Sequence, residues 1–164
     1  MDEALFGRIT AIKSCWCPMG IRPIVSSLKV REFVYAYGAV EPITGEKYFI
    51  IAGGCNTAWT NLFLAELSNA FPDDYILLCA DNASWHRSSA LVLPDNIELF
   101  FIPPATPEMN PMEQIWEELK EKHFDNLFFK SLDKVIDKLC FATNSIQPNN
   151  IISITARDWI VSTG

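Results

Sequence analysis

Two short apolar runs, separated by a polar segment, constrain the fold of this chain more than any other feature. Residues 75–80 are apolar and rich in β-forming side chains, which favours a strand buried on both faces. Asp81 follows this run directly, and a second run at 97–102 leads into a proline-rich loop. Ligands bind open α/β sheets at the edge where strands end. The pattern therefore predicts an α/β fold with Asp81 at a ligand-binding edge.

A helix is predicted after the proline-rich loop. Asn110 is a good N-cap, Pro111 fits the first helical position and Glu113 falls at the third. The apolar stripe of this helix consists of Met112, Ile115, Trp116 and Leu119. Glu113 borders that stripe, about 60° from Trp116, because successive helical residues are rotated by about 100°. Its carboxylate is therefore expected to reach inward while the helix stays packed.

Each of these carboxylates also has a purely structural interpretation. Asp81 and Asn82 are residue types that stabilise turns, so they could simply reverse the chain. Glu113 could complete a capping box with Asn110, although Ser or Thr is the usual partner. The residues alone leave both interpretations open.

Three motifs carry a family resemblance. DNASWH begins at Asp81, and PPATPEMNPMEQIWEELK runs from Pro103 to Lys120. The opening MDEALFGRIT, followed by CWCPMGIRP, adds a first carboxylate. Together these stretches resemble the catalytic half of the DDE transposases of bacterial insertion sequences in the mariner superfamily. The resemblance spans nearly the whole chain and implies one ribonuclease H-like catalytic domain over residues 1–164, with a mixed sheet flanked by helices.

The resemblance also implies a site and a reaction. Asp2, Asp81 and Glu113 would be the catalytic residues, and they would hold two Mg2+ or Mn2+ ions. The implied reaction is cleavage of DNA phosphodiesters at transposon ends followed by strand transfer, without a covalent enzyme intermediate. The implied partners are transposon-end and target DNA, with a homodimer of this chain in the active complex.

Three further polar residues are candidates for supporting this site: Asn82, His86 and Asn110. His86 could orient a water, a phosphate or Asp81 near the metal ions, or it could be a hydrogen-bonded polar residue on a helix flank. Asn82 could position a metal-bound water or only stabilise the turn. The resemblance favours a place near the site for His86.

Carboxylates suit the implied chemistry. Cutting a phosphodiester needs an activated nucleophile and neutralised charge at the phosphate, and two hard cations about 3.5–4 Å apart supply both. Hard cations prefer carboxylate oxygens as ligands. The sequence contains no obvious Ser-His-Asp or Cys-His pattern that would offer a nucleophile from the protein itself.

The N-terminus is unusual for this family. Asp2 follows only a methionine, so we expect its strand to be truncated and Asp2 to lie at a fraying terminus. The helix-turn-helix region that precedes the catalytic half in the family is likewise expected to be absent. Glu3 could replace Asp2 as a ligand, although strand alternation points it to the other face.

Length and charge set further bounds. A chain of 164 residues fits one domain, and no run approaches the roughly 20 apolar residues of a membrane span. No export signal is visible, which predicts a cytoplasmic protein with reduced cysteines. Cys15 and Cys17 lack partners at a zinc-finger spacing, so a structural zinc site is not expected. The net charge is −7 and residues 48–107 hold six acidic residues against one basic residue. Such a centre suits divalent cations, but the domain alone should bind DNA weakly.

The remaining elements are predicted from apolar spacing and capping residues. The predicted extended segments are two pieces within 5–30 around a turn at 18–20, which include Trp16 and residues 21–25, and two strands at 32–40 and 47–52 joined by a hairpin. The predicted helices are one over 57–70 capped by Thr57, a short one from Ser84 to Leu93, one after Ser131 and a final one over 148–161.

Two other functions stay open. The chain could be an inactive, truncated transposase remnant that acts only as a folded interaction or dimerisation module. It could also be an unrelated hydrolase with a carboxylate pair, such as a glycosidase, in which one acid has a raised pKa.

Overall fold

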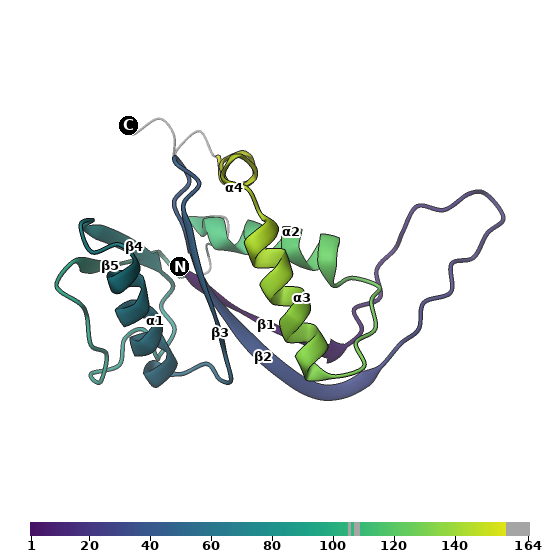
Figure 1. The fold of residues 1–164 in the computed structure, drawn as a ribbon, viewed down its shortest axis with the longest axis horizontal. Helices are drawn as coiled ribbons and strands as arrows, with labels where there is room; N and C mark the ends of the chain where they lie inside the picture. The colour runs from purple at the N-terminus through teal and green to yellow at the C-terminus, as the bar shows by residue number, and fades with distance from the viewer. Residues whose placement is uncertain (105, 107–108, 157–164) are drawn as a thin grey trace.

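The computed structural model describes residues 1–104, 106 and 109–156. Three strands form an antiparallel sheet in the order β1-β2-β3, namely β1 (Asp2–Ile9), β2 (Lys29–Val40) and β3 (Lys47–Ala52). Two more strands form a parallel pair, β4 (Ile76–Ala80) and β5 (Ile97–Phe101). The helices are α1 (Thr57–Ala70), α2 (Pro111–His123), α3 (Leu132–Ser145) and α4 (Pro148–Thr155), and Figure 1 shows their arrangement.

The central strand β2 is buried on both faces. Ala36 and Tyr37 are neighbours in sequence and both are fully buried, because alternate residues of a strand point to opposite sides. Ala36 belongs to a core built by β1 and β2 with α2, α3 and α4. Tyr37 belongs to a second core, which α1, β4 and β5 complete. The α1 and β4–β5 elements therefore lie on one side of the antiparallel sheet, and α2 to α4 on the other (Figure 1).

Several predicted elements are confirmed. β4, β5 and α2 lie where the apolar runs and the Asn110 cap predicted them, and the α2 stripe is buried. The predicted strands at 32–40 and 47–52 correspond to β2 and β3, which are joined by a turn. In that turn Gly45 has φ +76° and its N–H donates to the Glu41 carbonyl at 2.9 Å. A mixed α/β fold is therefore confirmed.

The expected truncation of the first strand is not confirmed. β1 extends over eight residues and begins at Asp2, so the carboxylate lies at the start of the strand. Asp2 pairs with Gly38 of β2 and is only 8% exposed, and it does not lie at a fraying end. The strands form two sheets within the described residues, and the two meet where the Met1 ammonium donates to the Cys79 carbonyl.

The segment between β1 and β2 departs from prediction. Residues 10–28 form a long irregular loop that projects from the body (Figure 1), although the turn at Gly20 is present with φ +86°. The predicted strand positions at Trp16 and 21–25 are wrong. Trp16 is fully exposed and Ile24 is 97% exposed. An apolar pattern forms a strand only where a partner strand and a core cover it, and neither is provided here.

Two helix predictions also need correction. The predicted helix from Ser84 to Leu93 is replaced by turns, where the Ser88 hydroxyl accepts the N–H of Ala90 at 3.2 Å. Such local side-chain bonds compete with a helix. The cap of α1 is Asn56, which accepts the N–H of Trp59 at 3.1 Å, and Thr57 is the first helical residue.

The C-terminal helices agree with prediction as far as they are described. Ser131 caps α3 as predicted and accepts the N–H of Lys134 at 3.3 Å. The final helix α4 ends at Thr155, and residues 157–161 of the predicted helix lie outside the described residues. None of the helices described is long and apolar enough to cross a membrane.

Candidate active site

The three predicted metal ligands line one cavity. Asp2, Asp81 and Glu113 contribute to a cavity of about 320 Å3, which we call the carboxylate cavity. The start of β1, the end of β4 and the first turn of α2 position these side chains. The other lining residues are Asn82, Ala83, Ile102, Pro103, Pro104, Thr106 and Asn110. Residues that are up to 111 positions apart in sequence therefore face a common space.

Asp81 is held from two sides. Its Oδ1 accepts the N–H of Ala83 at 3.0 Å and lies 2.8 Å from Nδ1 of His86. The side chain is 49% exposed, and among the described residues its Oδ2 has no hydrogen-bond partner. The turn expected from Asp81 is thus present, and the same side chain still offers an oxygen to the cavity.

Asp2 is the most constrained of the three carboxyl groups. The indole N–H of Trp116 donates to its Oδ2 at 3.0 Å. Burial raises the pKa of Asp2 to about 7, and the nearby negative charge of Glu113 raises it further in the same direction. A buried carboxyl group beside a like charge is stabilised by taking up either a proton or a cation.

Glu113 is presented by a well-capped helix. Oδ1 of Asn110 accepts the N–H of Met112 at 3.2 Å, and the Asn110 carbonyl accepts the N–H of Glu113 at 3.2 Å. Within the described part of the chain, the Glu113 carboxylate makes no hydrogen bond to the Asn110 backbone, so a capping box is not supported. The Glu113 side chain is exposed toward the carboxylate cavity.

His86 links Asp81 to a second carboxylate, that of Glu3. Nε2 of His86 lies 2.8 Å from Oε1 of Glu3, and the two side chains are 1% and 5% exposed. Burial alone would lower the pKa of His86, but the hydrogen bond and charge of Glu3, together with the charge of Asp81, raise it overall. His86 is therefore a buried bridge between two carboxylates, and not a residue on a helix flank.

Glu3 was considered from sequence only as a replacement for Asp2. The structure places it on the opposite face of β1, as strand alternation predicted, where it contacts His86 and does not line the carboxylate cavity. The contact joins residues 83 positions apart, so no local pattern could have indicated it. Alternation on β1 was the one usable signal.

The two asparagines predicted near the site line the cavity and stabilise its walls. Nδ2 of Asn82 donates to the Ile102 carbonyl at 2.7 Å, which ties the end of β4 to the end of β5. Nδ2 of Asn110 lies 3.5 Å from the Met1 carbonyl, beside the start of β1. Both side chains connect the elements that carry the acidic residues.

The donor chemistry of the carboxylate cavity fits hard divalent cations. Three carboxylates and two amide side chains line it, and Mg2+ prefers oxygen ligands while keeping several waters. Among the described residues, no three His, Cys, Asp or Glu side chains stand close enough together to hold one ion. The residues that would hold the ions therefore line the same cavity, but their side chains are not close enough together to coordinate one ion.

The sequence matches the DDE superfamily endonuclease family over residues 1–136. It is 35% identical to the uncharacterized protein y4pE/y4sA of Sinorhizobium fredii (strain NBRC 101917 / NGR234) over 130 residues, which cover 77% of this chain and 96% of that protein.

The fold is similar to that of the Mos1 transposase in its paired-end complex with the left transposon end. The TM-score is 0.70 at 16% identity, with coverage of 94% of this chain and 49% of that chain. The Mos1 mariner paired-end complex with Mn gives a TM-score of 0.69 at 14% identity, with coverage of 93% and 49%. This chain thus spans about half the length of the Mos1 chains it matches, and at such identities the likeness is one of fold.

Proposed function

This chain belongs to the DDE superfamily endonucleases, and we propose on that premise that it is the catalytic domain of a transposase that cleaves DNA phosphodiesters and transfers the cut strand. The observation that carries the proposal is that Asp2, Asp81 and Glu113 line one cavity. Family membership also sets aside the alternative of an unrelated glycosidase-like hydrolase.

The three carboxylates are the proposed ligands of two Mg2+ or Mn2+ ions. When bound, such ions activate a water or a 3′-hydroxyl and neutralise charge at the scissile phosphate. The raised pKa of Asp2 supports this assignment, because burial and the negative charge of Glu113 both disfavour the ionised carboxylate, and a bound cation would offset them. The Mos1 mariner paired-end complex with Mn has a similar fold.

The chain's own residues set the geometry. Trp116 fixes Asp2 by holding Oδ2, and His86 fixes Asp81 by holding Oδ1, which leaves Oδ2 of Asp81 for the cavity. Glu3 holds the far side of the His86 ring and so keeps it in place. We assign His86 and Glu3 as positioning residues, because neither lines the carboxylate cavity.

DNA is the proposed substrate, and a homodimer is the proposed active assembly. The related Mos1 structures are paired-end and strand-transfer complexes of a transposase. The net charge of −7 predicts weak affinity for DNA without divalent cations, because the phosphates of DNA are also negative.

A nicking assay tests the proposal. The full chain is incubated with supercoiled plasmid and Mg2+ or Mn2+, and we expect nicking that EDTA abolishes. Asp81→Asn and Glu113→Gln should each reduce the rate at least about a hundredfold, since each removes a ligand charge without changing shape. Glu117→Gln, on the exposed side of α2, is the matched control and should nick as the wild type does. Nicking that persists in either ligand variant would contradict the assignment.

An inactive remnant that acts as a folded interaction module is the second candidate. The observation in its favour is that, among the described residues, no three His, Cys, Asp or Glu side chains are close enough together to hold one metal ion. Calorimetric titration with Mn2+ separates the two. Heat that disappears in Asp81→Asn supports the enzyme, and heat no greater than that of the variant supports the remnant.

A further inference from the structure

Arg87 is the single lysine or arginine between positions 48 and 107, a stretch that holds six acidic residues. It lies in the turns that follow β4, and its side chain is exposed. Among the described residues that line the carboxylate cavity, none is a lysine or an arginine. A negatively charged substrate in that cavity therefore depends on bound cations and on whatever positive charge lies just outside it.

Arg87 lines a second cavity, which adjoins the carboxylate cavity at the end of β5. Its volume is about 520 Å3, and we call it the β5 cavity. Phe101, the last residue of β5, lines the β5 cavity, and the next residue, Ile102, lines the carboxylate cavity. Nη1 of Arg87 donates to Oδ1 of Asn82 at 3.4 Å, and Asn82 also lines the carboxylate cavity. A molecule that extends out of the carboxylate cavity past the end of β5 therefore meets Arg87.

The guanidinium group of Arg87 is held from two sides. Its Cζ lies 5.8 Å from the centroid of the Phe101 ring, which is a cation–π contact. Asn82, which accepts from Nη1, is itself fixed because its Nδ2 donates to the Ile102 carbonyl at 2.7 Å. A side chain that is already held loses less conformational freedom when it binds a ligand.

These contacts leave one edge of the guanidinium group available. Nε and Nη2 of Arg87 lie on the same edge of the planar group, and neither has a hydrogen-bond partner among the described residues. Two parallel N–H donors of this kind form a fork that fits two oxygens of a phosphate. The free edge of Arg87 is therefore suited to a phosphate group.

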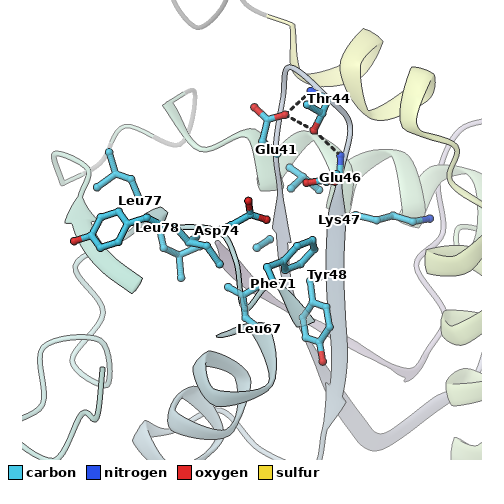
Figure 2. Close-up of a pocket in the computed structure, with 14 residues that line it drawn as sticks. Glu41, Thr44, Glu46, Lys47, Tyr48, Leu67, Phe71, Asp74, Leu77 and Leu78 are labelled. Atoms are coloured by element: carbon cyan, nitrogen blue, oxygen red, sulfur yellow. Dashed lines mark hydrogen bonds between the residues drawn. The ribbon is translucent and has the colours of Figure 1, made fainter. Parts of the chain in front are cut away.

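Two other cations on the antiparallel sheet are already engaged. The Lys47 side chain points away from the cavity drawn in Figure 2, and its Nζ donates to three carbonyl groups at the C-terminal end of α3. Arg8 donates to the Glu32 carboxylate at 2.6 Å and to two carbonyl groups of the segment between α2 and α3. Of these three cations, Arg87 is the one that keeps a free fork.

We propose that Arg87 binds a backbone phosphate of the DNA strand that is cut in the carboxylate cavity, close to the scissile phosphate. The inference rests on the proposed function. Nε and Nη2 donate to two oxygens of that phosphate, while Phe101 and Asn82 hold the guanidinium group in place. Phosphate contacts set the position of DNA without reading its sequence, so Arg87 is assigned as a substrate-positioning residue.

Salt-dependent DNA binding tests the inference on the full chain. A fluorescently labelled DNA duplex is titrated with the Asp81→Asn chain at constant Mg2+, so that DNA is bound without being cut, and Kd is measured over a series of KCl concentrations. Adding Arg87→Met should raise Kd at least about tenfold, since two charge-assisted hydrogen bonds are lost. The slope of log Kd against log salt should fall by about 0.9, which is the contribution of one phosphate contact.

Matched controls separate the fork from the charge. Arg87→Lys keeps the charge and loses the fork, so it should keep the salt slope and raise Kd by about threefold. Lys134→Met removes one positive charge from the exposed surface of α3, where Lys134 pairs with Asp137 at 2.8 Å. It should leave Kd within about twofold of its parent and the salt slope unchanged.

Nicking kinetics distinguish a DNA contact from a structural role. In the otherwise wild-type chain, Arg87→Met should raise the plasmid concentration for half-maximal nicking about tenfold and leave the maximal rate within about threefold, because the contact is made equally before and during the reaction. If Arg87 only supported Asn82, the variant would lower the maximal rate and leave the salt slope of binding unchanged. That result would overturn the inference.

The inference is also overturned if Arg87→Met has the Kd and salt slope of Lys134→Met, or if the Asp81→Asn chain binds no DNA. Nicking by the wild type tests the proposed function separately. A chain that nicks DNA while Arg87→Met binds normally keeps its proposed function and loses this inference. A chain that binds DNA through Arg87 but does not nick it does the reverse.

Discussion

The carboxylate cavity and the turn between β2 and β3 each contain an acidic side chain with a shifted pKa, Asp2 in the first and Glu41 in the second, and the two shifts have opposite directions. In the first, burial raises the pKa of Asp2 to about 7, with Glu113 adding to the effect. In the second, burial would also raise the pKa of Glu41, yet hydrogen bonds from Thr44 and from the N–H of Ile43 lower it overall. Glu41 thus stabilises a turn as an anion, whereas Asp2 remains in need of a proton or a cation.

The comparison teaches that hydrogen-bond donors, and not burial alone, separate a structural carboxylate from a chemically available one. Glu41 has both backbone and hydroxyl donors from residues two and three positions away. Asp2 has an indole donor and a backbone donor, but burial and the negative charge of Glu113 outweigh them and raise its pKa. Substitutions that remove a hydrogen-bond donor, an acceptor or a charge at these sites should therefore change the free energy of unfolding measurably.

The largest effect is expected at His86. His86→Ala leaves Glu3 buried and without its partner, which should lower the free energy of unfolding by about 3–5 kcal/mol. Urea denaturation measures the change. His123→Ala, at a half-buried position of α2 that has no carboxylate hydrogen-bonded to it among the described residues, should change stability by about 1 kcal/mol or less. Adding Glu3→Gln to His86→Ala should recover part of the loss, and a further loss in the double variant would show that unpaired charge is not the cause.

The next largest effect is expected at Asp2, whose ionisation makes the free energy of unfolding depend on pH. Because the folded pKa is above the unfolded value of 3.8, the folded state holds a proton that the unfolded state has released between about pH 4 and 7. Stability in EDTA should therefore fall as pH rises through that window.

Asp2→Asn should flatten this profile. At pH 8 the variant should exceed the wild type by about 2–4 kcal/mol, since it removes the ionised group but can keep an acceptor for Trp116. Asp95→Asn, an exposed control, should leave the profile unchanged. Parallel urea-unfolding profiles for the wild type and Asp2→Asn would show that this carboxyl group is not perturbed.

The smallest effect is expected at Glu41. Glu41→Ala removes the acceptor for Thr44 and Ile43 and should destabilise the chain by about 1 kcal/mol near pH 7. Because the folded pKa of Glu41 lies below its unfolded value of 4.5, this contribution should be lost as pH falls through that range. Glu46→Ala, on the exposed side of the same turn, serves as control. An equal loss of stability in Glu41→Ala and Glu46→Ala would show that the hydrogen bonds to Glu41 do not stabilise the turn.

Local patterns predicted a large part of the fold and part of the site. β4, β5 and α2 were recoverable because an apolar run, a cap and a helical stripe act over a few residues. Residues 10–28 were not, because apolar alternation forms a strand only where another strand pairs with it. The Glu3–His86 contact was likewise beyond local reach, since it joins β1 to the turn after β4.

By itself the sequence determined which residue types were available and where β4, β5 and α2 would begin and end, because capping, alternation and burial periodicity are short-range effects. It placed Asp81 after a strand and Glu113 in the first turn of a helix. Only the tertiary structure decided that these residues share a cavity with Asp2 and that His86 joins Asp81 to Glu3. Those outcomes depend on how the two cores pack against opposite faces of β2, which involves contacts between residues far apart in the chain.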